Sequence, residues 1–233
     1  MNPSLVPALA TQACIVAVLD RTPASALASL DEALAHDPDY ARGYAYRYLL
    51  LRMLGRAEEM LEAVRHAIDL DPHSVLNRHS FAAALFLNNR TEEALAAERE
   101  IHAFHPRDDI ALANIAVLAT RLGRYGEALE AAFEAIRLSE VNPSVQALAA
   151  YAFAEAGEKG EAGDLVRQAE SSRLPRAPRT ILAVAHLALG NRAYALELLG
   201  RARKEHCIWL PLSRLDPRLA PLADEPRFLA LFD

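Results

Sequence analysis

Residues 109–142 read DIALANIAVLATRLGRYGEALEAAFEAIRLSEVN, a stretch that predicts two amphipathic helices and the turn between them. Apolar residues recur at i, i+3, i+4 and i+7 from Leu112 onward, which places them on one helical face. Gly123 follows, and glycine tolerates the positive φ that commonly ends a helix. Small apolar residues then line one face over 128–135. The stretch therefore predicts a helix–turn–helix unit.

The unit repeats along the chain with a period of 34 residues. Three series follow this interval: prolines (Pro38, Pro72, Pro106), alanines (Ala33, Ala67, Ala135, Ala169, and Ala202 after a step of 33) and glycines (Gly55, Gly123, Gly157, Gly190). Asn89 stands at the one position of the glycine series that lacks glycine. A period of this length indicates stacked supersecondary units, each too small to bury its own apolar faces. The pattern predicts an all-α protein.

These residues resemble the tetratricopeptide repeat (TPR) family, in which large and small residues, a turn glycine, alanines and a terminal proline recur at fixed positions. The resemblance implies a right-handed α-solenoid of about six repeats over 7–205, starting near residues 7, 41, 75, 109, 143 and 176. We expect residues 1–6 to be an N-terminal extension and 206–233 to be a C-terminal helical cap. Arg47 and Tyr48 depart from the family pattern, where Leu-Gly is usual. The unbroken period favours one continuous solenoid.

In the resembled family, partners usually lie in the concave groove lined by the first helix of each repeat. Counting from each repeat start, we expect the groove to present aromatic anchors, hydrogen-bond donors and arginines, a mixture that suits an extended or helical peptide. The expected groove residues are Arg42, Tyr46, Leu49, Arg52, His79, Ser80, Ala83, Phe86, Asn114, Val117, Arg121, Tyr151 and Glu155.

The two ends of the chain differ from the middle. The first helix is apolar nearly all round, and Ile15, Val18 and Leu19 occupy positions where groove residues belong. Because an apolar helix is normally covered, we expect self-association through this helix, giving a homo-oligomer. The non-periodic segment 206–233 is expected to cap the last repeat, anchored by Trp209 and Phe228.

Composition narrows the function classes further. The chain has 233 residues and a net charge of −6, and no apolar run is long enough to span a membrane. Residues 173–233 carry ten basic and six acidic groups, but the arginines lack aromatic interleaving, so nucleic-acid binding is not expected. Two cysteines, Cys14 and Cys207, expected at opposite ends of the solenoid, favour a reduced, cytoplasmic protein. Arg-rich, Lys-poor usage fits a bacterial genome of high GC content.

No residue set predicts chemistry. His102-x-x-His105 lacks further metal ligands at suitable spacing, and no nucleophile or acid–base pair stands out. We therefore expect no catalytic residues, metal or cofactor, and a non-catalytic scaffold or adaptor that binds a peptide or protein segment in the groove. Two alternatives remain open at this point: a repeat subunit of a larger enzyme or secretion assembly, and a self-associating structural scaffold.

Overall fold

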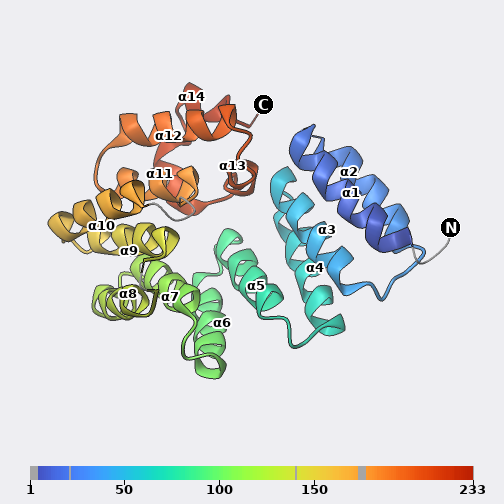
Figure 1. Ribbon diagram of the computed structural model, residues 1–233, viewed down its shortest axis with the longest axis horizontal. Helices are drawn as coiled ribbons and strands as arrows, with labels where there is room; N and C mark the ends of the chain where they lie inside the picture. The colour runs from blue at the N-terminus through green and yellow to red at the C-terminus, as the bar shows by residue number, and fades with distance from the viewer. Residues whose placement is uncertain (1–4, 21, 140, 173–176, 233) are drawn as a thin grey trace. The chain divides into compact units, whose positions relative to one another are not determined.

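The computed structural model of the chain describes residues 5–20, 22–139, 141–172 and 177–232, and within these ranges every regular element is helical (Figure 1). The predicted all-α fold is therefore confirmed. The expected start of the sixth repeat, residue 176, lies outside the described residues. The helices of the described ranges are α1 (Val6–Leu19), α2 (Pro23–Leu34), α3 (Ala41–Leu54), α4 (Ala57–Leu70), α5 (Val75–Leu87), α6 (Thr91–Phe104), α7 (Asp109–Arg121), α8 (Tyr125–Ser139), α9 (Pro143–Glu155), α10 (Lys159–Ser171), α11 (Arg179–Ala188), α12 (Arg192–Lys204), α13 (Trp209–Leu212), the 3₁₀ helix η2 (Pro217–Leu222) and α14 (Pro226–Leu229).

The turns within the helix pairs use the glycine series that the sequence shows. Gly55, Gly123, Gly157 and Gly190 all have positive φ, between 72° and 96°. Asn89, the non-glycine member of the series, also has a positive φ of 59°. Asparagine is among the residues that adopt this left-handed conformation most readily, so it serves the same turn.

The starts of three first helices follow a 34-residue series of their own. Ser74, Asp108 and Asn142 precede α5, α7 and α9, and each side chain accepts a hydrogen bond from a backbone N–H of the first turn. Such N-caps satisfy amide groups that have no partner within the helix. A helix boundary is thereby set at the same point of each of these repeats.

The chain divides into two compact units. One holds the chain up to Asn88 together with Pro211–Leu215, and the other holds Asn89–Leu210 and the chain from Asp216 on. In the first unit, α3 packs on α1, α2 and α4, and α5 packs on α4. In the second unit, α9 packs on α7, α8, α10 and α11. A single continuous solenoid stays a prediction.

Small residues allow this packing. Helix α9 is buried along most of its length, and six of its thirteen residues are alanine or serine. Backbones of neighbouring helices approach most closely where the side chains between them are small. The alanine series of the sequence serves the same purpose, since Ala33, Ala67, Ala135, Ala169 and Ala202 are all buried.

A second set of contacts joins the second helix of one pair to the first helix of the next. Each contact links residues 16 apart: Asp31 with Arg47, Arg65 with Phe81, Glu98 with Asn114, and Glu170 with His186. Arg47, which departs from the family pattern, therefore binds a carboxylate of the preceding repeat. Its neighbour Tyr48 is buried and accepts a hydrogen bond from Arg52 Nη1 at 3.0 Å.

Candidate protein-binding surface

The first unit holds eight of the predicted groove residues, four on α3 and four on α5. Arg42 is exposed, and the neighbouring positions Tyr46 and Leu49 are half-buried. On α5, His79 and Ser80 are half-buried in the same way. Seven of the eight thus retain accessible surface on first helices.

Phe86, the eighth, differs from this group because it is buried. The sequence places it at a groove position, but the ring belongs to the core, so it cannot serve as an accessible anchor without a change in packing.

The predicted groove residues of the second unit differ in exposure: Arg121 and Glu155 are exposed, whereas others are enclosed. Val117 on α7 and Tyr151 on α9 are each only 4% exposed. Asn114 donates a hydrogen bond from Nδ2 to Oε1 of Glu98 at 2.9 Å, and Glu98 is 1% exposed. The amide of Asn114 therefore satisfies a buried carboxylate. Asn114 was expected to offer its amide to a peptide in the groove. In the structure Glu98 uses this amide, because a buried charge needs an internal partner.

Tyr151 is covered by the C-terminal segment (206–232 in the described chain). The guanidinium of Arg218 lies over the Tyr151 ring, with its carbon 5.6 Å from the ring centroid. This distance is within the range of cation–π attraction. Burial raises the pKa of Tyr151 to about 12. The face of α9 that the sequence assigns to a partner is thus occupied by residues of the same chain.

Arg218 is itself held by Asp216. Its Nη2 and Nε donate to the two carboxylate oxygens at 2.7 and 2.9 Å, and the side chains are 13% and 7% exposed. Burial opposes the charge of Arg218, but the Asp216 carboxylate outweighs it and raises the pKa of Arg218. Asp216 also accepts the backbone N–H of residue 218 at 2.9 Å and so caps η2. The aspartate fixes both the backbone and the side chain that lie against Tyr151.

The same segment contacts a first helix in the first unit. Arg52 on α3, another predicted groove residue, donates from Nε to the backbone carbonyl of Leu212 at 2.7 Å. Near the end of α3, a Cβ placed on Gly55 would lie 3.6 Å from the Arg214 side chain. Residues 211–215 therefore meet α3 through a hydrogen bond from the Arg52 side chain to a backbone carbonyl and through the Arg214 side chain.

The end of the C-terminal segment covers the last helix pair. Arg192 on α12 donates to the carboxylate of Glu225 and to the carbonyl of Pro221. Phe228 is buried, and its ring meets that of Phe232 at 5.3 Å between centroids. Trp209, which the sequence analysis expected to anchor the cap, is 46% exposed instead. Trp209 is the first residue of the short helix α13, and its indole lines a cavity instead of lying in the core.

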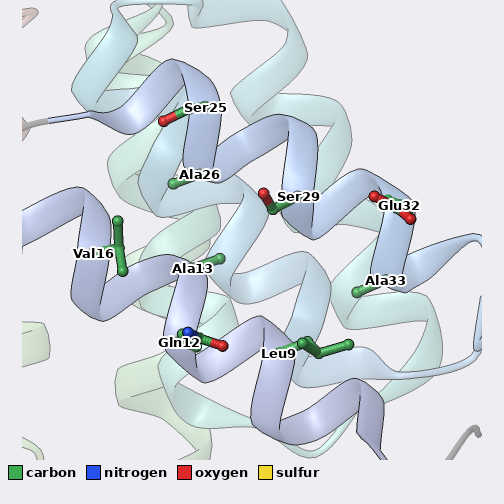
Figure 2. A pocket seen from close by; sticks show the side chains of 9 residues that line it. All are labelled: Leu9, Gln12, Ala13, Val16, Ser25, Ala26, Ser29, Glu32 and Ala33. Atoms are coloured by element: carbon green, nitrogen blue, oxygen red, sulfur yellow. The ribbon is translucent and has the colours of Figure 1, made fainter.

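Helix α1 exposes the apolar residues that suggested self-association. Ile15 and Leu19 are 52% and 64% exposed, and Val18 is half-buried. Helices α1 and α2 also enclose a depression of about 290 Å³, which these three residues do not line (Figure 2). Its floor is made of small side chains such as Ala13 and Ala26, and polar side chains stand at its edge. Self-association through Ile15, Val18 and Leu19 stays a prediction.

The described residues hold neither a metal-binding cluster nor a membrane-spanning helix. In the described ranges no group of three or more His, Cys, Asp or Glu side chains converges on a possible metal position. His102 and His105 lie at the end of α6, the first half-buried and the second exposed. None of the helices described has both the length and the apolar character needed to cross a membrane.

No protein-family model matches the sequence, and no curated protein matches it either. Solved structures do match. PilW, described as a widely conserved type IV pilus biogenesis factor, aligns with a TM-score of 0.61 and 19% identity over 96% of this chain and 97% of its own. The chain has the tetratricopeptide-repeat fold.

Two further TPR-type structures support this assignment. Pseudomonas aeruginosa PilF aligns with a TM-score of 0.60 and 17% identity, covering 93% of this chain and 95% of its own. YrrB, described as a TPR protein with an unusual peptide-binding site, gives 0.51 and 14% identity over 79% of this chain and 87% of its own. At these identities the likeness concerns the fold alone.

Proposed function

We propose that the chain is a non-catalytic scaffold that binds an extended protein segment on the face of its first helices, and that its own C-terminal segment occupies part of that face. The observation that carries the proposal is the way this segment is held. Arg52 donates a hydrogen bond to the backbone carbonyl of Leu212, and the guanidinium of Arg218 lies over the Tyr151 ring. These are the contacts by which a TPR groove would hold a peptide: a main-chain hydrogen bond for affinity and a side-chain site for specificity.

A partner would use the accessible first-helix residues of the first unit. Arg42 offers a charge, while Tyr46 and His79 offer ring surface and hydrogen-bonding groups. Tyrosine and arginine are enriched among residues that dominate binding energy. A ligand that reached Arg52 as well would have to displace residues 211–215 of the C-terminal segment, so partner binding and release of these residues would be coupled.

Affinity purification from the native host tests the proposal. The wild type is compared with Arg42→Ala/Tyr46→Ala, which removes two accessible groups from α3. Arg167→Ala/Tyr125→Ala is the matched control, since it removes an exposed arginine and an exposed tyrosine from the second helices α10 and α8. We expect a partner that is lost with the α3 variant and retained with the control. Equal recovery from all three proteins would refute binding on the first-helix face.

A synthetic peptide of residues 209–222 tests the role of the C-terminal segment. If a partner and this segment share the face, the peptide will compete with the captured partner in proportion to its concentration. A peptide with Asp216→Asn and Arg218→Met in the same sequence is the control. No competition at any concentration would mean that the partner binds elsewhere.

The compartment is also part of the proposal. Both cysteines, Cys14 and Cys207, are free thiols. Unpaired cysteines are usual in reducing compartments, which supports a cytoplasmic protein.

A further inference from the structure

The second unit contains a cavity of about 670 Å³ between α10, α11, α12 and α13. Helix α11 has ten residues, whereas α7 and α9 have thirteen each, so it covers less of its neighbours than the other first helices of this unit do. The floor of the cavity is apolar and includes Leu182 and Leu198. A volume of this size falls within the usual range for ligand sites in proteins. The cavity shares no residue with the face of α9 that Arg218 covers.

One carboxylate at the rim is held in a fixed orientation. Oε1 of Glu170 lies 3.1 Å from Nε2 of His186 and accepts a hydrogen bond from the hydroxyl of Tyr194 at 3.3 Å. On the other side of the imidazole, the amide nitrogen of Asn191 lies 3.3 Å from Nδ1. An amide N–H can only donate, so Nδ1 of His186 accepts this hydrogen bond. Nε2 then carries the ring proton and donates a hydrogen bond to Glu170. The imidazole thus serves one carboxylate oxygen of Glu170, Oε1.

The second oxygen of Glu170 remains open to a ligand. Within the described chain Oε2 of this residue has no hydrogen-bond partner, and the side chain is 32% exposed. The other charges in the lining compensate each other, because Arg179 donates twice to the carboxylate of Glu205, at 2.6 Å each. The lining therefore carries one net negative charge, located at Glu170.

Two aromatic rings complete the site. Tyr194 and Trp209 both line the cavity, and Trp209 is partly exposed there. The faces of such rings attract cations, and tryptophan does so most strongly. Burial and the neighbouring Glu170 carboxylate raise the pKa of Tyr194, so its hydroxyl stays protonated and continues to donate.

We propose that this cavity binds an arginine side chain presented by a partner protein. The guanidinium would donate to Oε2 of Glu170 and stack on Trp209 or Tyr194, since a guanidinium is planar and pairs with both carboxylates and rings. The aliphatic stem and a neighbouring apolar side chain would cover Leu182 and Leu198. A lysine would meet the same charge but would lack the planar stacking.

The chain carries its own probe for the test, because Trp209 is its only tryptophan. The capped peptide acetyl-Ala-Leu-Arg-Leu-Ala-amide is titrated into the full chain while indole emission is recorded. We expect a saturable blue shift as the ring becomes covered. The same peptide with citrulline in place of arginine has nearly the same shape without the charge, and we expect it to bind at least about tenfold more weakly.

Glu170→Gln tests the assigned carboxylate. Glutamine keeps an oxygen that can accept from Tyr194 and His186, so the variant preserves the local bonds while removing the charge. We expect it to bind the arginine peptide about tenfold more weakly, with an unchanged far-ultraviolet spectrum. Glu158→Gln, an exposed change before α10, is the control and should bind as the wild type does.

A second variant keeps the test independent of how Glu170→Gln folds. Trp209→Ala removes a partly exposed ring, and its affinity is measured by calorimetry because the fluorescent probe is gone. We expect weaker binding of the arginine peptide by about fivefold or more. Equal affinity for the arginine and citrulline peptides, absence of saturable binding, or unchanged affinity in both variants would overturn the proposal.

Discussion

Replacing Arg218 with alanine is expected to release the C-terminal segment from α9. The guanidinium makes two short hydrogen bonds to Asp216 and lies 5.6 Å from the Tyr151 ring centroid. Removal of one partner from a buried ion pair costs about 3–5 kcal/mol, because the other charge is left uncompensated. Asp216 keeps its bond to the backbone N–H of residue 218, so the lower end, about 3 kcal/mol, applies here. Loss of the cation–π contact adds about 1 kcal/mol.

A loss of about 4 kcal/mol corresponds to a roughly thousandfold increase in the open population of the segment. Hydrogen–deuterium exchange with mass spectrometry measures this directly. Amides of η2, such as that of Leu219, should exchange faster by up to this factor. The increase is smaller where global unfolding of the chain already dominates their exchange. Peptides from α7 provide an internal reference and should keep their exchange rates.

Two variants separate the ion pair from general disturbance of the segment. Arg227→Ala changes an exposed arginine in α14 and should leave the exchange of η2 unchanged. Asp216→Asn/Arg218→Met removes both charges and should speed exchange less than Arg218→Ala does, since no buried charge is left behind. An increase below about fivefold in Arg218→Ala would refute the reasoning, because it would correspond to about 1 kcal/mol or less.

Three further outcomes follow from particular residues. Asn114→Leu removes the amide that donates to the buried carboxylate of Glu98. The variant should have a free energy of unfolding lower by about 1–3 kcal/mol, measured by urea denaturation. An unchanged free energy would contradict the role assigned to Asn114. Burial raises the pKa of Cys14 to about 11 from 9.0. At pH 8 its thiol should therefore react with a disulfide reagent roughly a hundredfold more slowly in the folded chain than in the unfolded chain. Equal reaction rates would argue against burial of Cys14. Because this pKa is raised on folding, its stabilising contribution is complete below pH 9 and is lost as the pH rises through about 11. Gly55→Ala should lower the melting temperature, because φ is 73° there and Arg214 packs beside it, at a cost of about 1 kcal/mol; an unchanged temperature would refute the requirement for glycine.

The repeat architecture could be predicted because its determinants are local and recur. A turn that needs positive φ selects glycine or asparagine, which explains why Asn89 could be assigned to the glycine series before its backbone was known. The alanine series was equally informative, since close helix packing excludes larger side chains at those positions. The N-caps Ser74, Asp108 and Asn142 also recur every 34 residues, so this series predicts where three first helices begin.

The binding surface was harder to predict, because it depends on contacts between distant segments. Nothing in the sequence near Tyr151 indicates that Arg218 lies on its ring, since the C-terminal segment has no repeat period. Position within a repeat indicates which face a residue occupies, but it does not show whether another segment covers that face. Phe86 and Val117 illustrate the same limit, because both occupy groove positions and are buried.

The cavity beside Trp209 was missed for a related reason. Its residues come from four helices, and two of them, Glu170 and Tyr194, take part in a hydrogen-bond network that only the fold brings together. A partial signal was available, since the contact between Glu170 and His186 repeats the 16-residue spacing of Glu98 with Asn114. A polar pair at this spacing, one residue on each of two adjacent repeats, could be sought in the sequence of other TPR proteins.

Photo-crosslinking from position 151 tests the central claim most directly. p-Azidophenylalanine, close in size to tyrosine, replaces Tyr151 in the full chain, and the crosslinked peptides are identified by mass spectrometry after irradiation. If the C-terminal segment occupies the first-helix face of α9, the crosslinks will fall within 216–219, and they will decrease when Arg218→Ala is added. Crosslinks confined to other segments, or a pattern unchanged by Arg218→Ala, would contradict the account.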